Sequence, residues 1–407
     1  MSAEKMISPI HPVRQFQLDP DFRRKCDYVR EKEKQQLAPT RFQSGAEVAV
    51  AGFDFKCPVT PGMTANDLQA HLGKTMRAID EMSQFVAFWD GPRQIFSFDS
   101  HLAGLLSETE VGDVPWEVVR LPYEAFYVHF GCALTESLDF NGRKYKADGA
   151  YVRLQKGPSV IEGFLSGALH VIVTTKLVEP KYEEACKANT VWRSLKEPVY
   201  TVTISGTDGE TVGSALERGR KAELELAKHH DDNLLKNALQ LAAEEGVSTF
   251  DARNIHAEEQ RFLRGEKLTT EALPLLFNCI FYLTSVAGEV EPVFPPDSPK
   301  GLVEKLAKAN TPNRRSILSD DLLRRGYTKI RFISDPVPRT ETVGASAGRS
   351  VRTHWRRGHW RRQPIGAGLA RVALKWIRPC VVNADKGEPI VGRVYDVRKD
   401  EVGGTSS

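Results

Sequence analysis

The sequence predicts an α+β protein in which an antiparallel β-rich region is followed by a helical region and a C-terminal basic β-hairpin module. Three observations support this class. Short runs rich in Val, Ile, Tyr, Phe and Thr alternate with turn residues between positions 116 and 206. The hydrophobic period becomes helical from 212 to 288. A segment rich in Arg and Trp, interrupted by glycines, follows position 349.

Composition excludes several classes of protein. The 407 residues are 41% apolar and 27% charged, which is ordinary for a globular chain and unlike a disordered, collagen-like or coiled-coil one. Changes in composition along the chain divide it into six parts. These are a polar N-terminal arm (1–45), a mainly antiparallel β domain (46–211), a helical region (212–334), a linker (335–349), a basic β module (350–397) and a disordered tail (398–407).

Within the β domain, alternation of apolar and polar residues predicts a strand over 46–55, and helical spacing predicts a helix over 68–88. Five strand-like runs follow, and no helix of useful length separates them before Lys181, so a parallel β-α-β arrangement is not expected in this region. The runs are WEVVRL (116–121), AFYVHF (125–130), GAYVRL (149–154), ALHVIVTTKL (168–177) and VYTVTI (199–204).

The helical region is predicted to contain one helix over 213–228 and a second over 231–246, with Asp231 or Asp232 capping the start of the second. The uncharged stretch 272–288 is shorter than the roughly 20 residues that span a bilayer, and it contains Pro274 and Asn278. It is therefore predicted to be a buried core helix, and no membrane segment is expected. Short helices near 302–309 and 319–325 and a strand over 327–334 complete the region.

The basic module concentrates the positive charge of the chain. Nine Lys or Arg residues and no acidic residue lie between 349 and 378. Removing these nine from the 56 basic residues leaves 47 against 53 acidic ones, so the rest of the chain has a net charge of −6. Charge blocks of this kind usually serve interaction rather than folding.

A β-hairpin with a five-residue glycine loop is predicted for the module, with the break at Pro364–Gly368. Strand alternation places Val372, Leu374 and Trp376 on one face, and the pairing would bring Trp355 or Trp360 next to Trp376.

Three uses of the module remain open. In the first, the protein contacts DNA or RNA, with guanidinium groups on phosphates and a tryptophan stacking on bases. In the second, it is an enzyme acting on nucleic acid or a nucleotide, with His354 or His359 as the acid or base. In the third, the ribbon docks on the acidic body of the same chain or on a protein partner. The candidate nucleic-acid-binding residues are Arg352, Trp355, Arg356, Arg357, Trp360, Arg361, Arg362, Arg371 and Lys375.

Histidines and cysteines give no metal site. His354 and His359 are five residues apart, a spacing that points them apart on a helix or a strand unless the chain turns near Gly358. His129 and His170 could line one cavity only if their strands were neighbours. The six cysteines are far apart and form no C-x-x-C, which indicates reduced thiols in a cytoplasmic protein. We expect no metal and no cofactor, since no nucleotide-binding glycine loop is present.

The basic module also resembles the C-terminal segment of uncharacterised bacterial and phage-associated proteins. The resemblance depends on the pattern H-W-R-R-G-H-W-R-R-Q-P-x-G over His354–Gly366, followed by W-I-R-P over Trp376–Pro379. It covers roughly 35 residues, under a tenth of the chain. It implies a bacterial or mobile-element origin and no particular activity.

Overall fold

The computed structural model describes most of the chain from residue 93 to residue 382. The predicted arm, the strand over 46–55, the linker after Asp335 and the tail lie outside the described residues, apart from Asp27 and Glu31 in the arm. The described residues are 93–131, 138–140, 143–155, 167–177, 200–244, 257–325, 327–335, 354–369 and 371–382, with Asp27, Glu31, Phe88, Gly91 and Leu134 as single positions.

A mixed sheet with strand order β7-β6-β5-β3-β1-β8 forms the centre of the molecule, and β4 pairs with β5 beside this path. The pairs β3–β5, β5–β6 and β6–β7 are antiparallel, as predicted for this part of the chain. The strands are β1 (Gln94–Phe98), β3 (Ala125–His129), β4 (Leu138–Phe140), β5 (Arg143–Gln155), β6 (Ala168–Leu177), β7 (Tyr200–Ile204) and β8 (Arg331–Ile333).

The fold class is mixed α+β, and the structure corrects two details of the β region. Strand β1 pairs parallel with both β3 and β8, so the sheet is not wholly antiparallel. Helix α5 (Ser100–Ser107) follows β1 in the chain and lies in the connection to β3, which a parallel pair requires. The run 116–121 is not a strand, since Trp116–Val118 forms a short 3₁₀ turn after Pro115.

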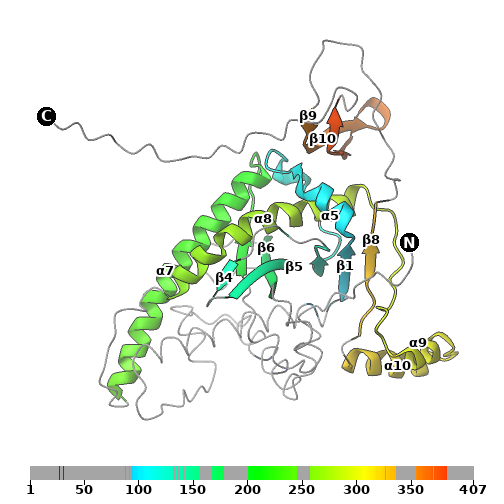
Figure 1. Ribbon diagram of the computed structural model, residues 1–407, viewed down its shortest axis with the longest axis horizontal. Coiled ribbons are helices and arrows are strands. Elements are labelled where there is room, and N and C mark those ends of the chain that lie inside the picture. Colours follow the sequence, from blue (N-terminus) through cyan, green and yellow to red (C-terminus); the bar gives the residue numbers. More distant parts are fainter. Residues whose placement is uncertain are drawn as a thin grey trace.

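Helices α5, α7 (Val212–Glu244) and α8 (Ala257–Ser285) lie over one side of the sheet (Figure 1). The stretch predicted as a core helix is the buried part of α8, as expected. The predicted break near 229–231 is wrong, because α7 continues without interruption. Asp231 is buried, and its Oδ2 accepts the backbone N–H of Glu259 at 2.9 Å. This aspartate therefore caps the first turn of α8 rather than a helix of its own.

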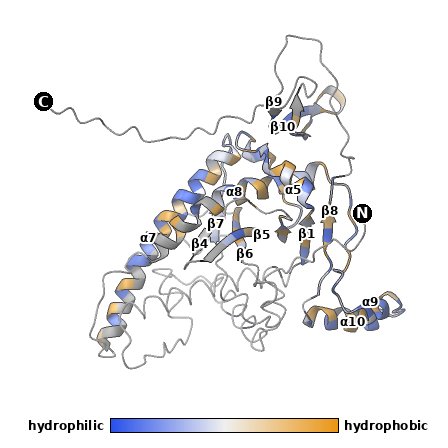
Figure 2. Ribbon diagram, viewed as in Figure 1, coloured by the Kyte–Doolittle hydropathy of each residue, from blue (hydrophilic) through white to orange (hydrophobic). Residues whose placement is uncertain are grey.

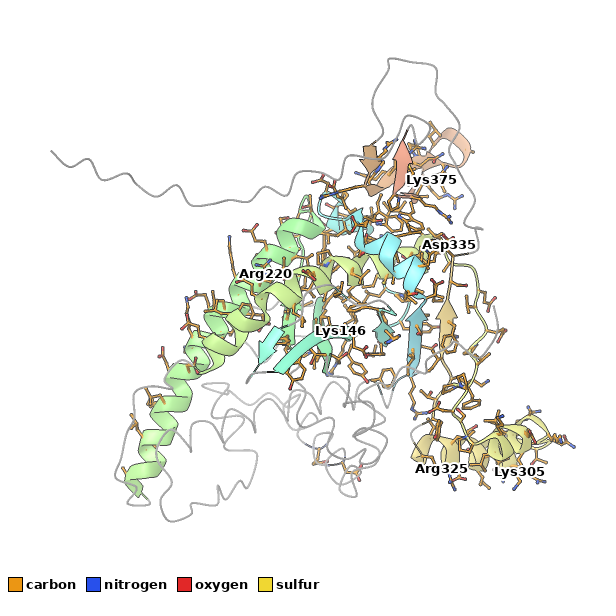
Figure 3. All side chains as sticks on the ribbon, viewed as in Figure 1. Lys146, Arg220, Lys305, Arg325, Asp335 and Lys375 are labelled. Carbon is orange, nitrogen blue, oxygen red and sulfur yellow. The ribbon has the colours of Figure 1, made fainter. Side chains whose placement is uncertain are left out.

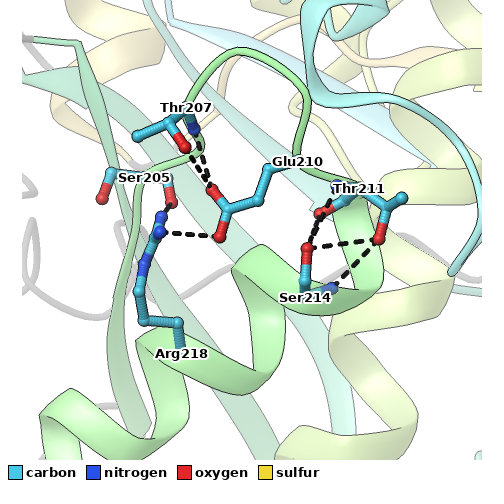
Figure 4. A network of polar contacts seen from close by, with 6 residues as sticks. All are labelled: Ser205, Thr207, Glu210, Thr211, Ser214 and Arg218. Carbon is cyan, nitrogen blue, oxygen red and sulfur yellow. Dashed lines mark hydrogen bonds and ion pairs between the residues drawn. The ribbon is translucent and has the colours of Figure 1, made fainter.

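The start of α7 is fixed by a reciprocal cap. Thr211 Oγ1 accepts the N–H of Ser214 at 3.3 Å, and Ser214 Oγ accepts the N–H of Thr211 at 3.1 Å. Glu210 accepts the N–H of Thr207 and pairs with Arg218 at 2.6 Å (Figure 4). The hydrogen bond from Thr207 lowers the pKa of Glu210 below its ordinary value. Together these contacts anchor the turn between β7 and α7.

Two further helices, α9 (Lys300–Ala307) and α10 (Pro312–Arg324), match the two short helices predicted after 300, although α10 starts seven residues earlier than expected. They form a small pair that projects from the sheet, with Lys305 and Arg325 pointing outward (Figure 3). Hydrophobic and hydrophilic residues alternate along both helices (Figure 2). In the described residues, no helix is long and apolar enough to cross a membrane.

The hydrophobic core joins distant parts of the sequence. One cluster contains residues of α5, the sheet, α7 and α8, and it also contains Trp360 and Trp376 from the basic module. On the other side of the sheet, Phe88 packs edge-on against Tyr151, with 5.4 Å between ring centroids. Phe88 is helical and is the one described residue of the predicted helix 68–88. The basic module is thus built into the body on one of its faces.

Candidate nucleic-acid interface

The basic module forms a bent two-stranded ribbon. Strand β10 (Gly358–Ile365) pairs antiparallel with β11 (Arg371–Ile377), and β9 (His354–Arg356) pairs antiparallel with β12 (Cys380–Val382). The hairpin and its five-residue connection are as predicted, but the connection is 366–370 because Pro364 and Ile365 still pair with β11. Figure 1 shows the ribbon at one end of the molecule, beyond α5.

The tryptophans of the hairpin face inward. Trp360 and Trp376 are directly opposite in the register, which is one of the two pairings that the sequence left open, and their rings stack with 6.4 Å between centroids. Each is only 8% exposed. Phe281 contacts Trp360 edge-on at 5.5 Å, and Tyr282 contacts Trp376 in the same way at 5.5 Å. Four aromatic rings from α8 and the hairpin therefore form one packed group.

The indole N–H groups of both tryptophans donate hydrogen bonds to buried polar side chains. Trp360 Nε1 donates to Asn278 Oδ1 at 2.7 Å, and Trp376 Nε1 donates to Thr109 Oγ1 at 3.1 Å. Asn278 Nδ2 in turn donates to the carbonyl oxygens of Leu106 and Thr109, at 2.9 and 2.8 Å. Buried indole N–H groups need such partners. The network fixes the hairpin against α8 and the end of α5.

A backbone contact continues this attachment. Gly358 and His359 pair parallel with β2 (Thr109–Glu110). A Cβ on Gly358 would lie 2.4 Å from Thr109 Oγ1 and 2.8 Å from Pro379 Cδ, so only glycine fits at this position. Outside this contact, Arg357 Nη1 lies 3.2 Å from Glu110 Oε1, and both side chains are exposed. Exposed pairs of this kind contribute about 0–1 kcal/mol.

An ion pair joins Asp335, which follows β8, to Arg378, which follows β11. Arg378 Nη2 donates to Asp335 Oδ1 at 2.5 Å, and the Arg378 guanidinium lies 5.3 Å from the centre of the Trp376 ring. The side chain of Asp335 is 4% exposed, and Asp99 Oδ2 accepts the backbone N–H of Asp335 at 3.3 Å. Figure 3 shows Asp335 between β8 and the hairpin that carries Lys375. Burial is the main cause that raises the pKa of Tyr282 in this region, and the negative charge of Asp335 is the second cause.

The outward face of the hairpin is cationic. Arg361 is directly opposite Lys375 in the register, and both are exposed. Like charges directly opposite each other destabilise a sheet. On the other face, the N–H of Gly209 is the main cause that lowers the pKa of Glu117, and the charge of Arg362, which is opposite Leu374, adds to it. Five exposed cations of the ribbon form no ion pair with any carboxylate of the described residues. They are Arg356, Arg361, Arg362, Arg371 and Lys375.

The structure places most of the predicted site residues. Arg356, Arg357, Arg361, Arg362, Arg371 and Lys375 are exposed on the ribbon, whereas Trp360 is buried against Asn278. Trp355 pairs with Val381 and His354 with Val382 along the backbone, and their side chains and Arg352 lie outside the described residues. His359 is partly buried on β10. His129 and His170 do not meet, because β5 lies between their strands.

Sequence reasoning missed one polar cluster. Ser97 Oγ lies 3.0 Å from His129 Nδ1, and Asp148 Oδ1 lies 3.6 Å from His129 Nε2. A bulge between Ala147 and Gly149 in β5 places Asp148 at this position, and nothing in the sequence announces that bulge. A serine nucleophile must reach its substrate, but Ser97 is buried, so we assign the cluster a structural role. In the described part of the chain, no group of three His, Cys, Asp or Glu residues is arranged to hold a metal ion.

Comparison with known proteins gives the family. The family model described as "AcrVA2-like: Anti-CRISPR type V subtype A2 family" matches residues 96–384, well over half of the chain and including the whole described ribbon. The chain belongs to this AcrVA2-like anti-CRISPR family. The resemblance seen in the sequence reached only uncharacterised bacterial and phage-associated proteins, and the family match replaces it with a named anti-CRISPR family.

One solved structure is also similar. A crystal structure of AcrVA2 matches over 89% of this chain and 95% of that chain, at 12% identity and a TM-score of 0.35. The comparison with curated proteins found no match.

Proposed function

We propose that this protein inhibits a type V-A CRISPR system by acting on the Cas12a machinery, and that it contacts nucleic acid through the outward face of its hairpin. The family supports the first part. The second part is carried by one observation. Arg361 and Lys375 are neighbours across the hairpin, are exposed, and have no carboxylate partner among the described residues.

Binding of a polyanion relieves the electrostatic repulsion between Arg361 and Lys375 on this face. Two opposed cations raise the free energy of the isolated hairpin, and phosphates lower it by pairing with both. The inner tryptophans and their polar partners attach the backbone of the ribbon to the body, so the points from which the cations project are fixed before binding. A backbone that needs no ordering on binding reduces the entropy that association costs.

The burial of the two tryptophans limits which parts of a nucleic acid the hairpin can contact. Trp360 and Trp376 are packed in the core, so the proposal does not include the base stacking expected for Trp360 from the sequence. The contact is therefore with phosphates, which fix position and carry no base sequence. We expect binding that tolerates changes of base sequence and weakens as salt rises.

A cell assay with matched variants tests the function. Cells carrying a Cas12a interference system are challenged with a targeted plasmid, and transformation efficiency is measured with wild-type protein, with R361Q/K375Q and with R314Q/K305Q. The control pair removes the same charge from exposed sites on α9 and α10. We expect the wild type and the control to restore transformation and the hairpin variant to lose most of this effect.

Two outcomes contradict the proposal. If wild-type protein does not restore transformation, the type V-A assignment is wrong. If R361Q/K375Q inhibits as well as the wild type, the hairpin face is not the functional surface. Binding to purified Cas12a free of nucleic acid that depends on the same two cations would identify an acidic protein surface as the partner instead of phosphates.

A further inference from the structure

The far end of the hairpin exposes three large aliphatic side chains, which we call the apolar tip. These are Ile365 (38% exposed), Leu369 (65%) and Val372 (49%). Leu369 belongs to the connection between the strands, and the other two flank it. Ile365 is opposite Arg371 and Val372 is opposite Pro364, so these two side chains lie on opposite faces of the ribbon, with Leu369 in the turn between them.

The backbone at the tip favours a functional interpretation. Leu369 has φ of +57°, in the left-handed region that bulky L-residues rarely adopt. Gly366 and Gly368 beside it also have positive φ, at 85° and 64°. Glycine at 369 would adopt this conformation without strain, yet the chain has leucine there. The turn therefore holds a strained residue and presents its side chain to solvent.

The apolar tip projects beyond the body. Along the inner face of β11, Trp376 is buried in the core, Leu374 is partly buried, and Val372 is exposed. These residues share one face of the strand, so the change in exposure marks the point where the ribbon leaves the body. A partner can thus approach the tip from both faces.

Cations surround the apolar tip. The Arg371 guanidinium lies 3.5–3.6 Å from the position that a Cβ on Gly366 would occupy, directly beside the loop. Arg361, Arg362 and Lys375 follow along the strands, and the sequence has no acidic residue between 349 and 378. The combination is an aliphatic point flanked on both strands by positive charge.

We propose that the apolar tip is a wedge that enters double-stranded nucleic acid between two base pairs while the flanking cations hold the phosphates. The proposal rests on the proposed function, since it requires the hairpin to bind nucleic acid. Aliphatic side chains act as such wedges in proteins that kink a duplex. An aliphatic point is a poor platform for unpaired bases, which stack on aromatic rings, and the described tryptophans of the hairpin face inward.

The wedge is tested with the full-length protein and two short duplexes, one of DNA and one of RNA. Each carries 2-aminopurine at several steps, and its fluorescence rises when a base is unstacked. A second set carries dyes at both ends, so that bending is measured as energy transfer. Anisotropy measures binding in the same samples. The variants are L369S, L369G and the control I317S, which removes an exposed aliphatic residue from α10.

We expect binding by the wild type to raise the 2-aminopurine signal and the energy transfer in at least one duplex, which also identifies the duplex recognised. L369S and L369G should lose both signals while still binding, and I317S should keep them. L369G separates loss of the wedge from unfolding, because glycine relieves the left-handed backbone and its thermal midpoint should be no lower than that of the wild type.

The outcomes separate the two proposals. Binding with no unstacking or bending, or with signals that L369S and L369G retain, overturns the wedge and leaves the proposed function intact. No binding to either duplex at low salt overturns nucleic-acid contact by the hairpin, and the wedge falls with it.

Discussion

Asn278 holds the hairpin to the body through three buried hydrogen bonds, and replacing it with leucine removes all of them. Trp360 Nε1 loses its acceptor, and the carbonyl oxygens of Leu106 and Thr109 lose their donor. A typical hydrogen bond contributes about 1 kcal/mol net, and a buried group left unpaired costs about 1–3 kcal/mol. Leucine has the same branching and the same number of side-chain heavy atoms as asparagine, although its methyl groups are bulkier, and it gains some apolar burial. We therefore expect N278L to lower the free energy of unfolding by about 3 kcal/mol.

The measurement is urea unfolding followed by tryptophan fluorescence, which reports the buried Trp360–Trp376 pair. A double-mutant cycle with W360F isolates the contact, because phenylalanine has no N–H to leave unpaired. We expect the double variant to be at least about 1 kcal/mol more stable than the sum of the single changes predicts. A loss below about 1 kcal/mol for N278L, or additive effects in the cycle, would refute the hydrogen-bonded attachment of the hairpin.

Three further changes follow from single contacts. G358A introduces a methyl group 2.4 Å from Thr109 Oγ1, so we expect a loss of about 1–3 kcal/mol in urea unfolding, and a neutral result would contradict the close packing of β10 on β2. D231A removes the side-chain acceptor of the Glu259 N–H and should lower the free energy of unfolding by about 0.5–2 kcal/mol. D231N should lower it less, and equal losses for the two variants would contradict the capping role. Burial raises the pKa of Tyr282 above its ordinary value of 10.0, so the unfolded state loses its proton first and stability falls as the pH rises above about 10. Y282F should flatten that part of a stability profile against pH, and an unchanged profile would show that another group is responsible.

The hairpin shows which features of the structure can be predicted from local sequence patterns. Strand alternation and a glycine-rich break predict the antiparallel ribbon and a tryptophan pair across it, with Trp355 or Trp360 next to Trp376, because both features depend on residues close in sequence. The predicted break at Pro364–Gly368 begins two residues before the loop of the structure, because proline at 364 is typical of a break but is tolerated at an exposed strand end. Which face of the ribbon is buried did not follow from the pattern.

The remaining errors have a common physical cause, which is contact between residues far apart in the chain. Asn278 and Trp360 are 82 residues apart, and Thr109 and Trp376 are 267 apart. The sequence showed Asn278 only as a polar interruption of an apolar helix. In the same way, Asp231 read as the cap of its own helix, whereas it caps α8 from the side. The parallel pairing of β1 with β8 joins strands more than 230 residues apart, and no local signal predicts it.

The salt dependence of nucleic-acid binding tests the role of the hairpin face most directly. The logarithm of the association constant is plotted against the logarithm of salt concentration for the wild type, R361Q/K375Q and R314Q/K305Q, with one DNA duplex. Each phosphate contact contributes a slope of about −0.9 with B-form DNA, so we predict that the hairpin variant has a slope shallower by about 1.8 and the control an unchanged slope. Equal slopes for the wild type and the hairpin variant would contradict phosphate contact by Arg361 and Lys375.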